Sequence, residues 1–169
     1  MLIGANLEQP APTSVDLVTV GSTLDLADAV AAHAGQADLV VMAAAVADYR
    51  PATVSDGKLR KADHEENLTI ELVQNPDILA GLVRDRLGEQ VIVGFAAETA
   101  PDRDSLIELG RQKLARKGCD YLVLNRVGWS EGFATEGNTI VVLDSAGAIV
   151  MEASGSKSSV ADSLLDSLV

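Results

Sequence analysis

Short, continuous apolar runs are the feature that most limits how this sequence can fold. Such runs occur within residues 38–45, 90–97 and 120–125. A strand can be apolar at successive positions only if both of its faces are covered, as in a parallel sheet between helices. Hydrophobic residues make up 47% of the 169 residues and aromatic residues only 3%, so the core is predicted to consist of Ala, Val, Leu and Ile. These features favour an α/β fold over an all-β sandwich.

Helical patterns separate the predicted strands. Four helices are predicted, and they cover residues 23–35, 76–87, 105–117 and 157–168. Thr23 and Asn75 are the predicted N-caps of the first two helices, and Gly118 is predicted to end the third. Pro76 directly after Asn75 suits the first position of a helix, because its missing N–H would have no partner there.

The remaining segments complete a Rossmann-like α/β fold. Further strands are predicted at residues 1–4, 16–20 and 68–72, and an antiparallel hairpin at residues 138–144 and 148–152, whereas residues 50–66 read as a polar loop. Residues 16–45 would form the first β-α-β unit. The order predicts a mostly parallel sheet with helices on both faces and a C-terminal antiparallel hairpin, in a single domain over residues 1–169.

The charge and the cysteine content exclude several classes of partner. The net charge is −12, which argues against nucleic acid and against an anionic membrane surface as partners. The single cysteine allows neither an intrachain disulfide nor a multi-cysteine zinc site. No apolar run of about 18 residues and no signal peptide is recognisable, so we expect a soluble cytoplasmic protein.

Candidate ligand-binding residues follow three of the predicted strands. Ligands of such sheets bind at the carboxyl ends of the strands, which here are followed by residues 44–50, 95–99 and 125–126. The small residues 43–47 would let a ligand approach the backbone closely, and Asp48 adds a carboxylate. Helix packing by the alanines and a turn at Asp48 explain the same residues equally well.

Basic residues are concentrated in two short windows. Of 13 basic residues, four lie within residues 50–61 and four within residues 111–117. Lys113 and Lys117 are four residues apart and therefore share one helix face, where they could bind one polyanion. The alternative is a solvated helix face, but the acidic remainder of the chain makes that interpretation less attractive.

Other motifs carry weaker signals. The start of the predicted helix at residues 75–78 suits a neutral base or ribose better than a phosphate, since Asp77 would oppose an anion there. Phe95 could stack on a base, although a single phenylalanine in this position is more often a core residue. Neither a G-x-G-x-x-G motif nor a P-loop motif is present, and His33 and His64 have no partner at metal-ligand spacing.

Five linked motifs together resemble one enzyme family, phosphopantothenoylcysteine synthetase. The motifs are residues 43–50 (AAAVADYR), 58–61 (KLRK), 75–79 (NPDIL), 94–99 (GFAAET) and 113–117 (KLARK), in the family's order and spacing. This family is the CTP-dependent phosphopantothenate-cysteine ligase of coenzyme A synthesis. In many bacteria it forms the carboxy-terminal domain of a bifunctional protein whose fused decarboxylase domain, absent here, carries FMN.

The resemblance implies a CTP site assembled from these motifs. The residues implied to bind CTP are Met42, Ala43, Ala44, Asp48, Lys58, Pro76, Asp77, Ile78, Leu79, Phe95, Lys113 and Lys117. Ala44, Ala45 and Asp48 would border the acyl-nucleotide intermediate, and Lys58 would act on it from the polar loop. The resemblance also implies Mg²⁺, whose ligands it does not identify, and a homodimer.

The implied reaction has two steps. The carboxylate of 4'-phosphopantothenate attacks the α-phosphate of CTP and releases pyrophosphate, and the amine of cysteine then attacks the acyl-cytidylate, forming an amide and releasing CMP. A carboxylate is already a nucleophile at pH 7, so the first step needs alignment and charge neutralisation more than a general base. Closure of the loop at residues 50–66 would keep water away from the intermediate.

One departure from the family pattern affects the expected activity. The family's first strand with its G-G-T-x-E-x-x-D motif and the following N-x-S-S-G segment are not found in this sequence, and Asn6 lies in a different context. We therefore expect this chain to bind CTP but to be inactive or weakly active on its own. Two alternatives remain open: a nicotinamide-dependent oxidoreductase on the same fold, and a non-catalytic dimerisation module that uses the hairpin at residues 138–152.

Overall fold

The computed structural model describes residues 1–60, 67–127 and 137–168. Contacts between residues divide the chain into two compact units. The first unit consists of Met1–Val30 and Ala45–Asp77, and the second of Ala31–Ala44 and Ile78–Val169. The expectation of a single domain over residues 1–169 stays a prediction.

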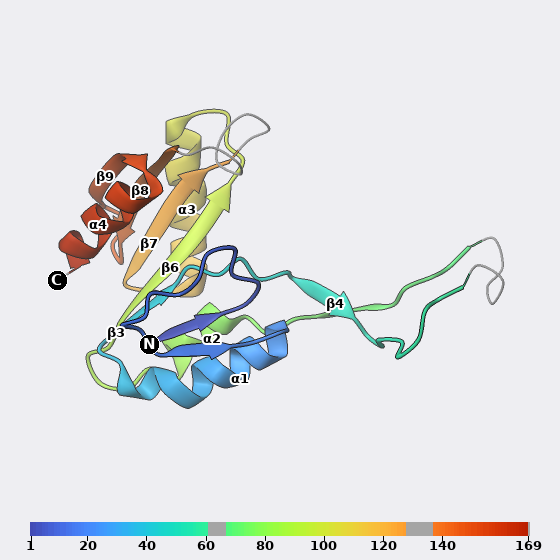
Figure 1. Ribbon diagram of the computed structural model, residues 1–169. Coiled ribbons are helices and arrows are strands. Elements are labelled where there is room, and N and C mark those ends of the chain that lie inside the picture. Colours follow the sequence, from blue (N-terminus) through green and yellow to red (C-terminus); the bar gives the residue numbers. More distant parts are fainter. Residues whose placement is uncertain (61–66, 128–136, 169) are drawn as a thin grey trace. The chain divides into compact units, whose positions relative to one another are not determined.

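The second unit is built on one sheet of five strands (Figure 1). In spatial order the strands are β3 (Leu39–Met42), β6 (Val91–Glu98), β7 (Tyr121–Arg126), β8 (Gly137–Asp144) and β9 (Ile149–Ser156). The first three strands run parallel, and β8 and β9 add an antiparallel hairpin. The three apolar runs of the sequence are therefore the three parallel strands, as predicted.

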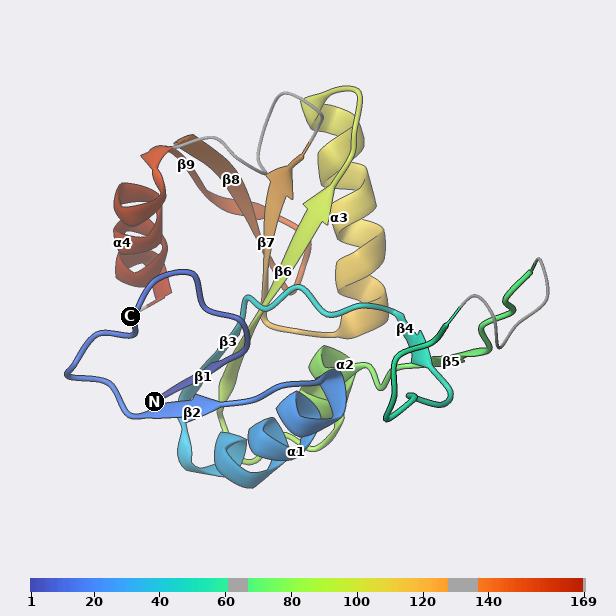
Figure 2. The same cartoon turned by 45° about the vertical axis from the view of Figure 1, so that its right-hand side comes forward.

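Helices cover both faces of this sheet. The helices of the unit are α2 (Ile78–Arg84), α3 (Arg103–Lys117) and α4 (Lys157–Leu168). Figure 2 shows α3 on one side of the sheet and α4 on the other. On the α4 face, Val93 and Val123 are buried with Val160 and other apolar side chains. This arrangement confirms the predicted α/β fold.

Helix α3 has a polar cap at its start and a glycine at its end. The backbone N–H of Ser105 donates to the Asp102 carboxylate at 2.7 Å, so the helix begins at Arg103, two residues before the predicted start. Gly118 has a φ of 71°, and its N–H donates to the Leu114 carbonyl at 2.8 Å. The prediction that Gly118 ends this helix is confirmed, because few other residues adopt that backbone conformation without strain.

The first unit contains only short strands. Its elements are β1 (Leu2–Gly4), β2 (Leu17–Thr19), the greater part of α1 (Thr23–His33), β4 (Tyr49–Pro51) and β5 (Leu72–Gln74); a 3-10 turn, η1 (Ala34–Gln36), follows α1 in the second unit. Strand β2 pairs in parallel with β1, and β3 belongs to the five-stranded sheet. The predicted β-α-β unit at residues 16–45 is therefore not formed within one sheet. The predicted cap of α1 was also one residue off, since the Asp25 N–H donates to the Ser22 hydroxyl rather than to Thr23.

The polar segment predicted as a loop begins as a strand. Tyr49–Pro51 pairs antiparallel with Leu72–Gln74, and residues 52–60 and 67–71 continue from this pair as an extension (Figure 1). The strand predicted at residues 68–72 begins only at Leu72, and Ile70 is exposed. These strands form because Tyr49, Arg50 and Pro51 pair with Gln74, Val73 and Leu72. No local periodicity in the sequence predicts a pairing between segments so far apart.

Candidate functional site

Asp48 lies at a bend in the first unit, just before β4. Its side chain is exposed, as are those of Ala45 and Ala47. The Asp48 carbonyl accepts a hydrogen bond from the Asn75 N–H at 2.8 Å, and the Ala47 carbonyl accepts one from the Asn75 side-chain amide at 2.9 Å. The backbone that carries the predicted Asp48 is thus held by a residue far away in the sequence.

Asn75 does not act as the predicted helix cap. Helix α2 begins at Ile78, and the Asn75 side chain bonds instead to Ala47, Thr23 and Arg50. Pro76 and Asp77 between Asn75 and the helix are exposed. The N-cap prediction was wrong because a local sequence pattern cannot reveal acceptors 28 and 52 residues away.

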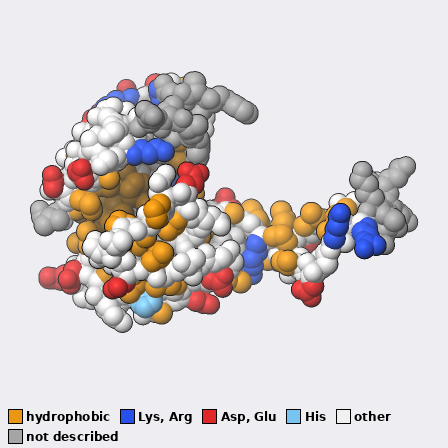
Figure 3. Space-filling view, in the orientation of Figure 1, with side chains coloured by type: hydrophobic (Ala, Val, Ile, Leu, Met, Phe, Trp, Pro, Cys, Tyr) orange, Lys and Arg blue, Asp and Glu red, His pale blue; other side chains and the backbone are white. Residues whose placement is uncertain are grey.

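Lys58 lies on the exposed extension of the first unit. A turn precedes it, in which the Gly57 N–H donates to the Ser55 hydroxyl at 3.3 Å. Figure 3 shows hydrophobic and basic side chains along this extension. Lys61 and His64, the other residues singled out in this segment, lie outside the described residues.

In the second unit, Met42 and Leu79 are each neighbours of Gly94. Met42 is paired with Gly94 in the sheet, and a Cβ atom at Gly94 would lie 2.6 Å from Leu79 Cδ2. Leu79 and Ile78 are both buried. Ala43 and Ala44 follow β3 and are exposed, as expected for residues at a ligand-binding edge.

Phe95 and Lys113 lie on opposite faces of the sheet. Phe95 is part-buried and packs against the apolar cluster on the α4 face. Lys113 comes from α3 and forms a part-buried ion pair with Glu98 at the end of β6. Lys117 is half-buried on the same side of α3 as Lys113. The lysine predicted to bind phosphate therefore already has an anionic partner in this structure.

A cavity of about 550 Å³ lies elsewhere in the second unit. Arg103, Arg126, Asn138 and Glu152 are among its lining residues. Arg126 is one of the candidate ligand-binding residues that follow a strand, whereas none of the residues implied to bind CTP lines this cavity. Asn138 accepts a hydrogen bond from Asn125 at 2.9 Å, so the predicted ligand residue Asn125 is also tied into this wall.

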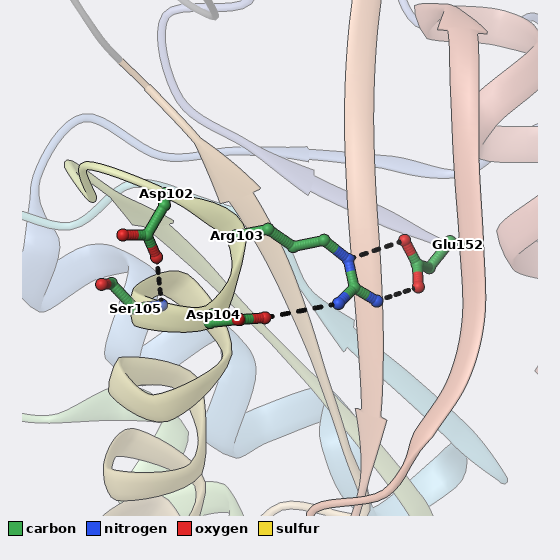
Figure 4. A network of polar contacts seen from close by, with 5 residues as sticks. All are labelled: Asp102, Arg103, Asp104, Ser105 and Glu152. Atoms are coloured by element: carbon green, nitrogen blue, oxygen red, sulfur yellow. Dashed lines mark hydrogen bonds and ion pairs between the residues drawn. The ribbon is translucent and has the colours of Figure 1, made fainter.

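Two residues that line the cavity, Arg103 of α3 and Glu152 of β9, form an ion pair with each other (Figure 4). The Arg103 guanidinium donates to both carboxylate oxygens of Glu152 and lowers the pKa of Glu152 below its ordinary value. The neighbouring Asp102 also has a lowered pKa, mainly because the Ser105 backbone N–H stabilises the charged carboxylate. Neither network was recognisable from the sequence, because the helix start was predicted two residues too late and Glu152 is remote.

The described residues include no group of three or more His, Cys, Asp or Glu arranged to hold a metal ion. A magnesium ion that enters with a nucleotide takes most of its ligands from phosphates and water. Likewise, no described helix is long and apolar enough to cross a membrane.

Within each unit, the structure brings some of the predicted site residues close together. In the first unit, Asn75 holds the backbone of Ala47 and Asp48. In the second unit, Met42 and Leu79 are each neighbours of Gly94, and Lys113 forms an ion pair with Glu98. Sequence reasoning missed Asn75 as a hydrogen-bonding centre and Glu98 as the partner of Lys113.

Comparison with known proteins assigns the family. The whole chain, residues 1–169, matches the family described as DNA/pantothenate metabolism flavoprotein C-terminal domain. The chain belongs to this family. The resemblance to the ligase family found from the five motifs is therefore confirmed at the level of the domain family.

Named relatives of this family domain are longer proteins. The coenzyme A biosynthesis bifunctional protein CoaBC of Mycobacterium bovis is 45% identical over 163 residues, which are 94% of this chain but 39% of that protein. The Escherichia coli protein of the same name is 38% identical over 141 residues, covering 82% of this chain and 34% of that protein. The chain thus spans less than half the length of these relatives.

Solved structures share the fold of the family domain. A crystal structure of the C-terminal domain of CoaBC has a TM-score of 0.75 at 28% identity, covering 98% of this chain and 70% of that one. A Cab2 variant in complex with phosphopantothenate-cysteine has a TM-score of 0.57 at 20% identity, covering 79% of this chain and 45% of that one. The second likeness concerns the fold alone.

Proposed function

We propose that this chain is the nucleotide-binding part of a phosphopantothenate-cysteine ligase of coenzyme A synthesis. The observation that carries the proposal is the 45% identity to a CoaBC protein over 94% of the chain, together with the family match over residues 1–169. The proposed substrates are CTP, entering with Mg²⁺, 4'-phosphopantothenate and cysteine. The enzyme is proposed to work in the cytoplasm as a homodimer.

The proposed reaction needs positive charge near the nucleotide more than it needs a base. In the first step a carboxylate of the substrate displaces pyrophosphate from CTP, and in the second the cysteine amine displaces CMP and gives an amide. Negative charge develops on phosphate oxygens in the first step, and fixed cations lower its cost. The proposed cations are Lys58, Lys113 and Lys117, three of the 13 basic residues of an otherwise acidic chain.

The ion pair of Lys113 gives this proposal a specific requirement. Lys113 is paired with Glu98, and both side chains are about a quarter exposed, at 26% and 24%. A triphosphate would have to replace or share this carboxylate, because an unscreened carboxylate next to a phosphate is repelled. The Glu98 carboxylate thus acts as a stand-in anion that the nucleotide displaces.

The first experiment is a calorimetric titration of the 169-residue chain with CTP, ATP and NADH, each with Mg²⁺. The proposal expects CTP to bind and ATP to bind clearly more weakly. No binding of CTP would count against the nucleotide site, and binding of NADH instead would favour the oxidoreductase alternative.

The phosphate-binding helix is tested with Lys113→Ala. The variant should weaken CTP binding about tenfold or more, because a hydrogen bond to a charged group is worth about 1.5 to 3 kcal/mol. Glu98→Gln should change the affinity in the opposite direction, since it removes the competing anion. Arg116→Ala is the matched control, because it removes an exposed positive charge from the same helix. Equal affinities for Lys113→Ala and Arg116→Ala would contradict the assigned role of Lys113.

A further inference from the structure

Among the described residues of the first unit, one polar side chain is buried, that of Asn75, and this residue makes four hydrogen bonds. Asn75 is 9% exposed, although asparagine is usually a surface residue. Its side-chain amide donates to the Ala47 carbonyl at 2.9 Å and to the Thr23 hydroxyl at 3.4 Å. Its side-chain oxygen accepts from Arg50 Nη1 at 3.1 Å, and its backbone N–H donates to the Asp48 carbonyl at 2.8 Å.

The chemistry of the partners fixes the orientation of the Asn75 amide. Arg50 can only donate and the Ala47 carbonyl can only accept, so the side-chain oxygen must face Arg50 and the nitrogen must face Ala47. Arg50 is itself held in place, because the same Nη1 atom donates to the Gln74 carbonyl at 2.9 Å. A turned amide would lose both bonds, so Arg50 sets the direction in which Asn75 donates.

Asn75 binds two successive carbonyl groups of the same segment. In an extended strand, successive carbonyls point to opposite sides. Here those of Ala47 and Asp48 both reach Asn75, one through its side chain and one through its backbone. The chain consequently leaves extended geometry at Asp48, where the structure has a bend, and the exposed Asp48 side chain projects from that bend.

We propose that Asn75, oriented by Arg50, is a positioning residue that sets where the Asp48 carboxylate points. The role of Asp48 at the nucleotide rests on the proposed function, whereas the hydrogen bonds that hold its backbone do not. A misplacement of about 1 Å at a reacting centre can reduce a rate about a hundredfold, so a fixed bend is useful to a residue that contacts the substrate. Asn75 acts through Asp48 and is not itself a catalytic residue.

The chain offers a matched control in the other unit. Gln90 is also a buried amide, 6% exposed, and its nitrogen donates to the carbonyls of Ala34 and Ala37 at 2.6 and 2.5 Å. Neither acceptor belongs to the proposed nucleotide site. Asn75→Ala and Gln90→Ala therefore remove the same kind of buried donor, and both should lower the melting temperature.

The test compares CTP affinity in the 169-residue chain at a temperature where both variants are fully folded. Asn75→Ala should raise the dissociation constant for CTP about tenfold, and Gln90→Ala should leave it within about twofold. If Asn75 acts through Asp48, its replacement should have no further effect in an Asp48→Ala background, because the group that it positions is then missing. Full additivity of the two replacements, or equal effects of Asn75→Ala and Gln90→Ala, would overturn the proposal.

A second measurement separates this proposal from the proposed function. Backbone amide exchange of residues 45–50 should accelerate in Asn75→Ala and not in Gln90→Ala, whether or not any nucleotide binds. If the unchanged chain fails to bind CTP, the proposed function is wrong. The exchange rates then still test whether Asn75 holds the bend at Asp48. Asn75→Ala keeps the backbone N–H that donates to the Asp48 carbonyl and removes only the side-chain bonds. Unchanged exchange in this variant would therefore show that the Asn75 side chain does not hold the segment at residues 45–50.

Discussion

The two units of the chain differ in the kind of interaction that stabilises each of them internally. The largest fully buried side chains among the described residues all belong to the second unit, and they are Ile92, Val93, Cys119, Leu122, Val123, Leu124, Ile140, Val142 and Leu143. In the described part of the first unit, the buried apolar side chains are Val20, Leu26 and Val30, and the buried polar one is Asn75. Burial of apolar side chains thus contributes most to the stability of the second unit, whereas hydrogen bonds to the backbone contribute a larger share in the first.

The strongest test of this comparison is a truncation in the core of the second unit. Leu122 is fully buried in β7, so Leu122→Ala should lower the free energy of unfolding by about 2 to 5 kcal/mol. Leu72→Ala in the first unit is the control, because Leu72 is 55% exposed and should cost less than about 0.5 kcal/mol. Urea denaturation measures both values. Similar losses for the two variants would remove the contrast between the units.

A smaller effect is expected from a polar interaction in the second unit. The pKa of Asp102 is lowered in the folded state, so its charge stabilises the fold above its ordinary pKa of 3.8, and this contribution is lost as the pH falls through the lowered value. Asp102→Ala should therefore lower the melting temperature at pH 7, and the difference from the unchanged chain should shrink in acid. Asp102→Asn can still cap the helix and should stay close to the unchanged chain at pH 7. A pH-independent loss in Asp102→Ala would contradict this account.

Local patterns in the sequence predicted the second unit better than the first. Strands β6 and β7 are continuously apolar because both of their faces are covered, and Gly118 ends α3 because of its backbone conformation. Each of these features is visible within a short stretch of sequence, so each could be predicted from it. The pairing of β4 with β5 and the hydrogen bonds of Asn75 join residues far apart in the chain, and no local pattern contains that information.

In the candidate site, too, some features could be predicted from the sequence and others could not. The motifs identified the residue types, including Asp48 and Lys113, through resemblance to a family. Their partners were not predictable, since Asn75 looks like a helix cap in its local sequence and Glu98 looks like the end of an apolar strand. Direct contact of the predicted residues with CTP stays a prediction.

The smallest effect is expected on the extension of the first unit. Ile70 is 60% exposed there, so Ile70→Ser should change the free energy of unfolding by no more than about 0.5 kcal/mol. Ile92→Ser in the fully buried core of the second unit is the contrasting variant and should be strongly destabilising. A large loss in Ile70→Ser, measured by urea denaturation at several protein concentrations, would show that another surface covers this side chain in solution.

The buried position of Cys119 allows the opening of the second unit to be measured by chemical labelling. It is the single cysteine of the chain, it is 1% exposed, and burial raises the pKa of its thiol. Because the thiolate is the reactive form, the folded chain should resist alkylating reagents at neutral pH. Each modified molecule then records one opening of the sheet and helix around Cys119, so the rate of labelling measures how often this unit opens under native conditions.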